Sequence, residues 1–258
     1  MISMRKTISL LTLIIAIVIF AISAYELFSI YSEYGKADTE YNELSQQYVN
    51  KNISAGVSDS GASSLPENSW DIDFESLKDI NSDIVAWISV PACGISYPIV
   101  QTDDNSKYLT KTFELNDNKS GSIFVDHDCK SDFTDFNTII YGHNMKNGSM
   151  FGSLKKLYQD TALMEGAPYF EIILPGNIVK RYEIFSYYID SSVSTSYVLT
   201  NTEEDDQAYL DYIMPKTIKN RGISVSTDDH IVTLATCSGS SGSKKRFFVH
   251  GVLVEGQQ

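Results

Sequence analysis

The feature that most restricts the fold of this chain is an uncharged apolar run near its N-terminus. The run covers residues 7–25, nineteen positions dominated by Ile, Leu, Val, Ala and Phe, and it follows Arg5 and Lys6. As an α-helix it would be about 28 Å long, close to the thickness of a bilayer hydrocarbon core. Backbone polar groups in lipid must be satisfied within the segment, so a helix is expected. The run predicts a transmembrane helix over residues 7–27 after a cytoplasmic tail of residues 1–6.

The charges beside this run indicate its orientation. Basic residues are retained on the cytoplasmic side of a membrane, so Arg5 and Lys6 predict that the rest of the chain lies outside the cell. A cleaved signal peptide is the alternative, because Ala21 and Ser23 offer small residues to a peptidase. The apolar run is longer than the usual signal-peptide core of about 7–15 residues. We therefore expect an uncleaved single-pass anchor in the cell membrane, and either interpretation exports the remaining chain.

The chain after the anchor divides at a change in composition. Residues 28–69 are polar and mixed, and we expect them to form a stalk and linker. A helical stalk is expected over 29–48, and a flexible linker over 50–69, which is rich in Ser, Gly, Asn and Ala. Residues 70–258 are expected to form one extracellular domain, because 43% of the 258 residues are hydrophobic and can bury one sizeable core.

The charge of the exported part argues against one class of partner. The formal net charge of the whole chain is −13, and the first 27 residues hold only Arg5, Lys6 and Glu26, so the remainder carries −14. A surface this negative repels phosphate backbones, and nucleic-acid binding is therefore not expected.

Short β-branched and aromatic runs recur beyond residue 70 and are typical of strands. The expected strands cover residues 85–90, 95–100, 122–125, 138–142, 169–174, 179–189, 230–236 and 247–254. Eight strands with few helices predict a mainly β fold, closed or nearly closed into a barrel. Peripheral helices are expected over 73–81, 150–158 and 203–218. Thr202 is the expected N-cap of the last helix, which has acidic residues in its first turn.

The three cysteines do not form a complete disulfide framework, because their number is odd. Cys93 and Cys129 could pair and leave Cys237 free, or both could be small unpaired residues. A domain of this size does not need a disulfide to fold, which favours the unpaired alternative.

Cys237 stands where a reactive thiol would be accessible. An apolar run ends just before it, and residues 238–245 are only Ser, Gly and Lys, as suits a loop, before Arg246 opens another strand. If the two strands pair as a hairpin, Cys237 and Arg246 are neighbours. A guanidinium there can lower the pKa of a thiol or hold a carbonyl oxygen as negative charge develops on it. The alternative is that Cys237 is a structural cysteine at a strand end, without a role in catalysis.

A thiol nucleophile also needs a proton acceptor and donor. His143 follows the apolar run 139–142 and is the best general acid–base candidate of the four histidines, because imidazole titrates near neutral pH. His127 lies among Asp126, Asp128 and further acidic residues, where a metal site is conceivable but a solvated acidic loop is favoured. His250 is interpreted as structural, and His230 as the surface start of a strand.

These residues fall into motifs that resemble the class B sortases of Gram-positive bacteria. Residues 233–237 (TLATC) resemble the TLxTC motif, Arg246 lies nine residues further on, and residues 141–144 (YGHN) resemble the histidine motif. Upstream blocks that match are residues 81–88 (NSDIVAWI), 97–101 (YPIVQ), Asp104-Asn105, Tyr108-Leu109 and 121–126 (GSIFVD). The resemblance runs from about residue 73 to residue 254.

The resemblance implies an eight-stranded sortase barrel without a cofactor or metal, and it assigns roles to named residues. It makes Cys237 the nucleophile, His143 the acid–base group, and Arg246 the group that binds substrate and stabilises the oxyanion. The implied substrate-groove residues are Asn105, Leu109, Tyr141 and Thr236. Ala235 stands where class B enzymes often have Ser, so a substrate hydrogen bond from that side chain is not expected. The long segment 190–222 between strands is expected to shape the groove.

The activity implied is a transpeptidation. The family cleaves a sorting signal near the C-terminus of a secreted protein after Thr, forms a thioester and passes the acyl group to a cell-wall amine. The expected partners are that secreted protein and a peptidoglycan amine, and class B relatives prefer motifs beginning with Asn-Pro or a variant. An exported cysteine hydrolase, a pilus-polymerising sortase and a non-enzymatic binding module are the alternatives. The sorting pentapeptide, the acceptor amine and the oligomeric state stay open.

Overall fold

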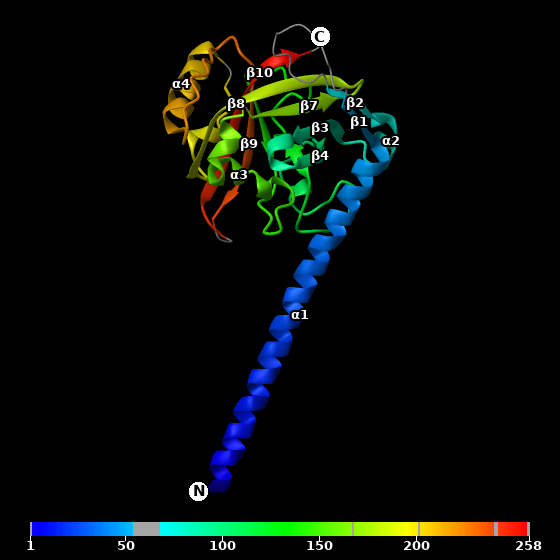
Figure 1. Cartoon of the computed structure of the whole chain (residues 1–258), viewed down its shortest axis with the longest axis vertical. Helices are drawn as coiled ribbons and strands as arrows, with labels where there is room; N and C mark the ends of the chain where they lie inside the picture. The colour runs from blue at the N-terminus through cyan, green and yellow to red at the C-terminus, as the bar shows by residue number, and fades with distance from the viewer. Residues whose placement is uncertain (1, 54–67, 167, 201, 240–241, 257–258) are drawn as a thin grey trace.

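The computed structural model describes residues 2–53, 68–166, 168–200, 202–239 and 242–256. A rounded β domain stands at one end of a long N-terminal helix, and the described C-terminal strand ends on the side of the domain away from that helix's free end (Figure 1). Most of the expected flexible linker falls on residues 54–67 and lies outside the described part.

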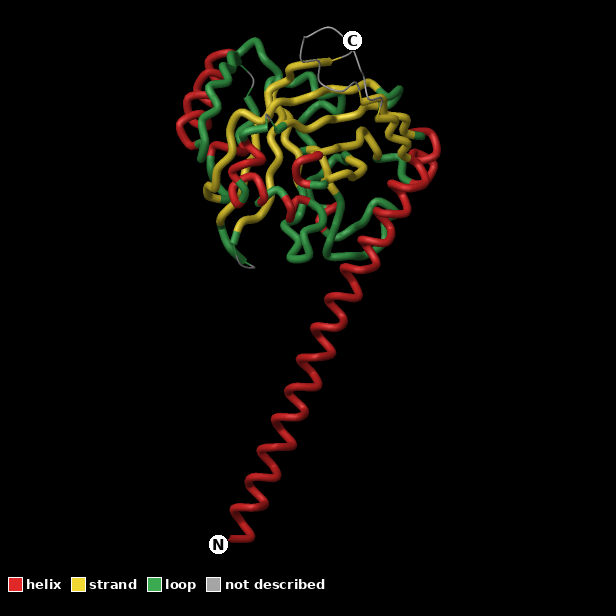
Figure 2. Tube along the Cα trace, viewed as in Figure 1, coloured by secondary structure: helices red, strands yellow, loops and turns green. Residues whose placement is uncertain are grey.

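The domain is a closed barrel of eight strands (Figure 2). In chain order they are β3 (Ile84–Val90), β4 (Ile95–Val100), β5 (Ile123–Val125), β6 (Asn137–Tyr141), β7 (Tyr169–Leu174), β8 (Ile178–Ser191), β9 (Ile231–Ser238) and β10 (Lys245–Gly256). Their order around the barrel is β10-β8-β7-β3-β4-β5-β6-β9. The β4–β5 and β6–β9 pairs are parallel, and the other six pairs are antiparallel. The predicted eight-stranded barrel is confirmed, with strand ends shifted by a few residues at most.

Large side chains fill the barrel because the runs that form the strands are apolar. Trp87, Phe170 and Phe247 in the main core are almost fully buried, and Phe248 is buried in a second cluster together with residues of helix 203–213. Gly251 allows the backbone of β10 to pack directly against the Phe170 ring, since a Cβ at this position would lie 2.5 Å from that ring. One buried ion pair joins two neighbouring strands: a guanidinium nitrogen of Arg181 on β8 donates to Glu171 on β7 over 2.9 Å.

The helices agree with the expectations in part. α2 (Phe74–Ile80) is capped by Asp73, and α4 (Glu203–Ile213) is capped by Thr202, whose hydroxyl accepts from Asp205 N over 3.2 Å. α4 is shorter than expected, because Pro215 has no backbone donor and the chain continues as a 3₁₀ turn, Met214–Lys216. The helix expected over 150–158 is instead a 3₁₀ turn, Phe151–Ser153, followed by the one-turn α3 (Lys156–Gln159).

The N-terminal helix α1 (Ile2–Tyr48) is continuous and has two different halves. From Ile8 to Ser29 every side chain is exposed, and by length and composition this helix is apolar enough to cross a membrane. Further along, Ala37, Tyr41 and Leu44 are buried in the main core against the barrel. The C-terminal part of the segment expected as a stalk therefore packs on the domain (Figure 1).

A two-stranded sheet follows α1 and was not predicted. β1 (Val49–Ile53) pairs antiparallel with β2 (Asn68–Ile72), and Asp73 N donates to Tyr48 O over 3.0 Å. The indole of Trp70 on β2 donates to Glu171 in the barrel over 3.0 Å. The chain that follows α1 and the chain that leads into α2 are thus joined to each other by backbone pairing.

Candidate active site

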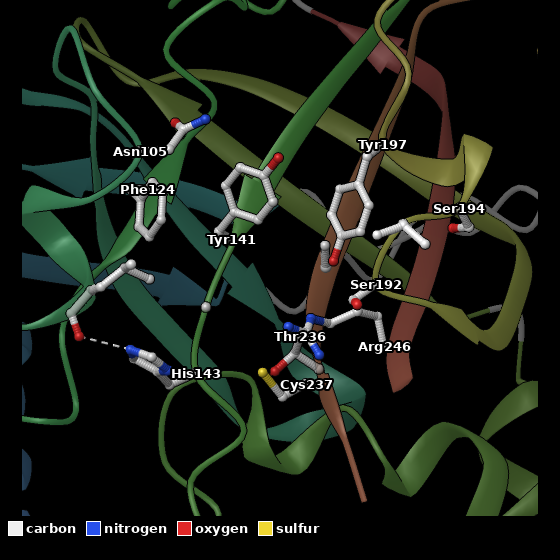
Figure 3. Close-up of a pocket in the computed structure, with 14 residues that line it drawn as sticks. Asn105, Phe124, Tyr141, His143, Ser192, Ser194, Tyr197, Thr236, Cys237 and Arg246 are labelled. Atoms are coloured by element: carbon white, nitrogen blue, oxygen red, sulfur yellow. Dashed lines mark hydrogen bonds between the residues drawn. The ribbon is translucent and has the colours of Figure 1, made fainter. Parts of the chain in front are cut away.

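A pocket of about 510 Å³ lies at the rim of the barrel (Figure 3). Its lining residues are Asn105, Leu109, Phe124, Tyr141, Gly142, His143, Ser192, Val193, Ser194, Tyr197, Ala235, Thr236, Cys237 and Arg246. All seven residues that the sequence singled out for chemistry or substrate binding are among them. The structure therefore brings together side chains separated by up to 141 positions in the chain.

The pairing of the last two strands places the thiol beside the guanidinium. Cys237 on β9 is the register partner of Arg246 on β10, so the neighbour relation predicted for a hairpin is confirmed. Cys237 is the one exposed cysteine of the described chain. Cys93 and Cys129 are unpaired and buried, and burial raises the pKa of each thiol to about 12. A solute can therefore reach a thiol readily only at Cys237.

A second pairing places the histidine on the same rim. β6 and β9 are parallel, and Tyr141 is the register partner of Ala235. His143 and Cys237 each follow two residues after this pair, so both emerge where the parallel strands end. Figure 3 shows the His143 imidazole beside the Cys237 sulfur at one end of the pocket.

The tautomer of His143 follows from its hydrogen bond. Nε2 lies 2.8 Å from the Leu109 carbonyl oxygen, which can only accept, so Nε2 carries a proton. In the neutral imidazole Nδ1 is then the proton acceptor, and Figure 3 shows the free side of the ring turned toward Cys237. This arrangement lets the ring take up or release a proton on the side of the thiol.

Arg246 is held by backbone groups and by a tyrosine. Its guanidinium donates to the carbonyls of Ser243 and Lys245, each over 3.0 Å. Burial raises the pKa of the Tyr197 hydroxyl to about 12, with the charge and hydrogen bond of Arg246 acting in the opposite direction. Tyr197 was not singled out from the sequence, although it lies in segment 190–222, which was expected to shape the groove.

Two residues of the far wall are held by one carboxylate. Asp126 Oδ2 accepts from Asn105 Nδ2 over 3.0 Å and from the Tyr141 hydroxyl over 2.7 Å. Burial and then the hydrogen bond to Asp126 raise the pKa of Tyr141, which stays protonated. The ring of Tyr141 stacks on Tyr197 with centroids 6.0 Å apart, and Phe124 lies 5.2 Å away on the other side. The pocket thus has a rigid aromatic side.

The remaining two expected groove residues differ in exposure. The Leu109 side chain is 41% exposed and open to a ligand. Thr236 is 5% exposed, and its hydroxyl is buried without a hydrogen-bond partner within the described ranges. Its position beside Cys237 in the pocket lining makes it a wall residue whose backbone and methyl group are the available surface.

The acidic turn beside this wall has the residue types of a cation site. Ligand atoms of Asp126, His127 and Asp128 lie within 4.8 Å of one another. Both Asp126 oxygens already accept hydrogen bonds, Oδ2 from Asn105 and Tyr141, and Oδ1 from Asp128 N over 3.0 Å. The carboxylate therefore serves as an internal acceptor, in keeping with the interpretation as an acidic turn.

A closed eight-stranded barrel whose rim carries an accessible thiol, an imidazole and a guanidinium defines a thiol-dependent acyl-transfer enzyme of the sortase type. The family model described as "Sortase domain" matches residues 88–254. The chain belongs to the sortase family, whose members are cysteine transpeptidases.

Its relatives carry the name sortase B. The curated Sortase B of Listeria monocytogenes is 35% identical over 185 residues, which are 70% of this chain and 74% of that protein. The crystal structure of sortase B from B. anthracis in complex with AAEK1 superposes with a TM-score of 0.70 at 30% identity, covering 88% of this chain and all of that one. The Staphylococcus aureus sortase B–substrate complex superposes with a TM-score of 0.64 at 30% identity, covering 70% and 84%. The resemblance found in the motifs is confirmed.

Proposed function

We propose that the chain is a membrane-anchored sortase that cleaves the C-terminal sorting signal of a secreted protein after a threonine and joins that protein to an amine of cell-wall peptidoglycan. One observation supports the proposal most: an exposed thiol, an imidazole and a guanidinium line one pocket at the barrel rim. Cys237 is the proposed nucleophile, His143 the acid–base group and Arg246 the group that stabilises the oxyanion.

In the first half-reaction the Cys237 thiolate attacks the carbonyl carbon of the threonine. The C–N bond breaks, the leaving amine takes a proton from the His143 imidazolium, and a thioester remains. Arg246, opposite Cys237 on the paired strand, lies where a guanidinium stabilises the negative charge that develops on the carbonyl oxygen.

In the second half-reaction an acceptor amine enters the same pocket. Neutral His143 removes a proton as the amine attacks the thioester, a new amide bond forms, and Cys237 leaves as the thiolate, which restores the thiolate–imidazolium pair. Water competes for the thioester, and we propose that the apolar rings of Tyr141 and Tyr197 in the pocket lining disfavour it relative to the amine. The proposed groove for the sorting motif is lined by Asn105, Leu109, Tyr141 and Thr236.

Single substitutions test the assignment of roles. Cys237→Ala, His143→Ala and Arg246→Ala are each expected to abolish thioester turnover of Asn-Pro-type peptides without changing the melting temperature. Cys93→Ala is the matched control, because it removes a buried thiol outside the pocket and should leave turnover intact. Retention of full turnover by Cys237→Ala would refute the proposal.

The fate of the thioester separates a transpeptidase from a hydrolase. We expect mass spectrometry of the products to show the amide of an added amine in proportion to its concentration. Product cleaved only by water, even at high amine concentration, would instead identify an exported cysteine hydrolase.

The proposed topology places residues 1–6 in the cytoplasm and the barrel outside, with α1 crossing the membrane. The exposed apolar side chains from Ile8 to Phe28 support this proposal. A maleimide that cannot cross membranes should label Cys237 in intact cells. Labelling only after the cells are lysed would contradict this topology.

A further inference from the structure

Within the proposed function, we infer that α1 is a part of the catalytic apparatus as well as an anchor, and that Tyr41 on its buried half is a positioning residue for His143. The inference rests on contacts that reach His143 from two sides. Both begin on one face of a helix whose other half carries the apolar segment.

The first set of contacts fixes residues 113–122, which form the wall behind the His143 imidazole. The hydroxyl of Tyr41, a residue only 4% exposed, donates to the Gly121 carbonyl over 2.7 Å and accepts from Phe113 N over 3.2 Å. It also lies 3.1 Å from the hydroxyl of Ser122, whose backbone N–H donates to the Tyr108 carbonyl over 3.0 Å. One side chain of α1 therefore ties together segments on both sides of the turn that precedes β5.

That wall is in contact with the ring of His143. Gly121 has φ +58°, and a Cβ built on it would lie 3.1 Å from His143 Cδ2 and 3.0 Å from the Leu109 carbonyl oxygen. This same carbonyl accepts from His143 Nε2 over 2.8 Å. The path from Tyr41 to the imidazole thus consists of one hydrogen bond to Gly121 and the packing of Gly121 against the ring and its carbonyl partner.

The second set of contacts holds the loop that follows His143. Asp38 on α1 accepts from Asn147 Nδ2 over 2.8 Å. The Tyr41 ring meets the Tyr97 ring edge-on at 5.2 Å, and the Tyr97 hydroxyl accepts from Met150 N over 3.1 Å. The imidazole is therefore bracketed by two segments, and α1 contacts both of them.

Two glutamates of α1 continue the attachment along the wall segment. Glu40, 9% exposed, accepts from Glu114 N over 3.0 Å, and Glu33 accepts from Lys119 N over 2.9 Å. Residues 33, 40 and 41 lie on one helical face, since seven or eight positions are close to two turns. Residues 113–122 are therefore attached to α1 at several points, and their position depends on the position of this helix.

The expected effect is on the chemical step and not on substrate binding. Within the described part of the chain the Tyr41 hydroxyl bonds to Phe113, Gly121 and Ser122 and not directly to a residue proposed to hold the sorting motif, so KM should change less than kcat. A displacement of about 1 Å in a reacting group can lower a rate up to about a hundredfold, and losing one of several supports should cost less. We expect Tyr41→Phe to lower kcat roughly tenfold.

Steady-state kinetics of the full-length chain in detergent micelles test the inference, with Tyr41→Phe set against Tyr182→Phe. Tyr182 is an equally buried barrel tyrosine whose hydroxyl has no hydrogen-bond partner within the described ranges, and it stacks on Phe170 away from the pocket. We expect only Tyr41→Phe to lose kcat, with KM within about twofold of the wild-type value. The pH dependence of Cys237 alkylation should also shift in Tyr41→Phe alone.

The outcomes are distinct. Wild-type kcat and an unchanged alkylation profile in a folded Tyr41→Phe variant would overturn the inference and leave the proposed function standing, whereas an inactive wild-type chain would refute the proposed function itself. If Tyr41→Phe does not fold, Asp38→Ala and Asn147→Ala decide the question, because both residues are at the surface. A kcat lowered about threefold in each, and no further in the double variant, supports the inference; wild-type kcat in both overturns it.

Discussion

Gly121 offers the sharpest test of how tightly the pocket is built. A methyl group added at this position would lie 2.4 Å from the Tyr108 carbonyl oxygen, 3.0 Å from the Leu109 carbonyl oxygen and 3.1 Å from His143 Cδ2. Two of these neighbours are backbone atoms, which cannot rotate away. The backbone φ of +58° is also one that residues with a side chain rarely adopt.

The loss of unfolding free energy in Gly121→Ala has a conformational and a steric component, and a second glycine separates the two. Gly148 has φ +88°, and a Cβ there would meet nothing within 4 Å, so Gly148→Ala carries only the conformational cost of about 1 kcal/mol. Gly121→Ala adds the steric overlap, typically about 1–3 kcal/mol for an overpacked site. We expect Gly121→Ala to lower the free energy of unfolding by roughly 3 kcal/mol.

Urea unfolding and peptide turnover measure the two consequences. Gly121→Ala should destabilise the protein clearly more than Gly148→Ala, and kcat should fall more than tenfold as the imidazole is displaced. Equal destabilisation by the two substitutions, or normal turnover in Gly121→Ala, would refute the view that this backbone approach positions His143.

Three further predictions follow from buried groups. In the native protein, iodoacetamide should modify Cys237 alone, and the other two cysteines should react only in urea; mass spectrometry of peptides after the reaction checks this. Burial lowers the pKa of His250 to about 3. The unfolded chain therefore binds the extra proton below a pH of about 6.5, and the free energy of unfolding should fall by about 2 kcal/mol between pH 6.5 and 5. In urea titrations of His250→Gln the free energy of unfolding should no longer show that fall between pH 6.5 and 5. The same fall in the variant as in the wild type would contradict the assignment to His250. Glu171→Ala removes the buried carboxylate that accepts from Arg181 and from the Trp70 indole, and it should cost about 3–5 kcal/mol of unfolding free energy. A loss under about 1 kcal/mol would show that water reaches this site.

The barrel strands could be predicted because their residues are apolar, β-branched or aromatic over runs that end at Gly, Pro, Asn or Asp. Thr202 could be predicted as a cap because capping is a local interaction. The β1–β2 sheet could not, since residues 49–53 (VNKNI) and 68–72 (NSWDI) are mostly polar, and the alternation of apolar Trp70 and Ile72 with polar neighbours is too short to indicate a strand. Their pairing is held by backbone hydrogen bonds, which any residue except Pro can make.

The site was predictable where chemistry restricts the residue type. Cysteine, histidine and arginine have few substitutes in acyl transfer, so their motifs identify them. Tyr197 stacks on Tyr141 from a segment without a strand pattern, and one of sixteen tyrosines is not distinctive. Tyr41 acts on a carbonyl eighty positions away, and that distance is bridged only by the folded chain.

The parallel pairing of β6 with β9 has a consequence for how such a protein can diversify. His143 and Cys237 are aligned by the ladder that ends at Tyr141 and Ala235, and residues 144–230 between them take no part in that ladder. Lengthening or replacing the excursion over residues 198–222, beyond the pocket residue Tyr197, should therefore leave the imidazole and the sulfur facing each other. Evolution or protein engineering can therefore introduce new recognition surfaces in this segment while the alignment of His143 with Cys237 is retained.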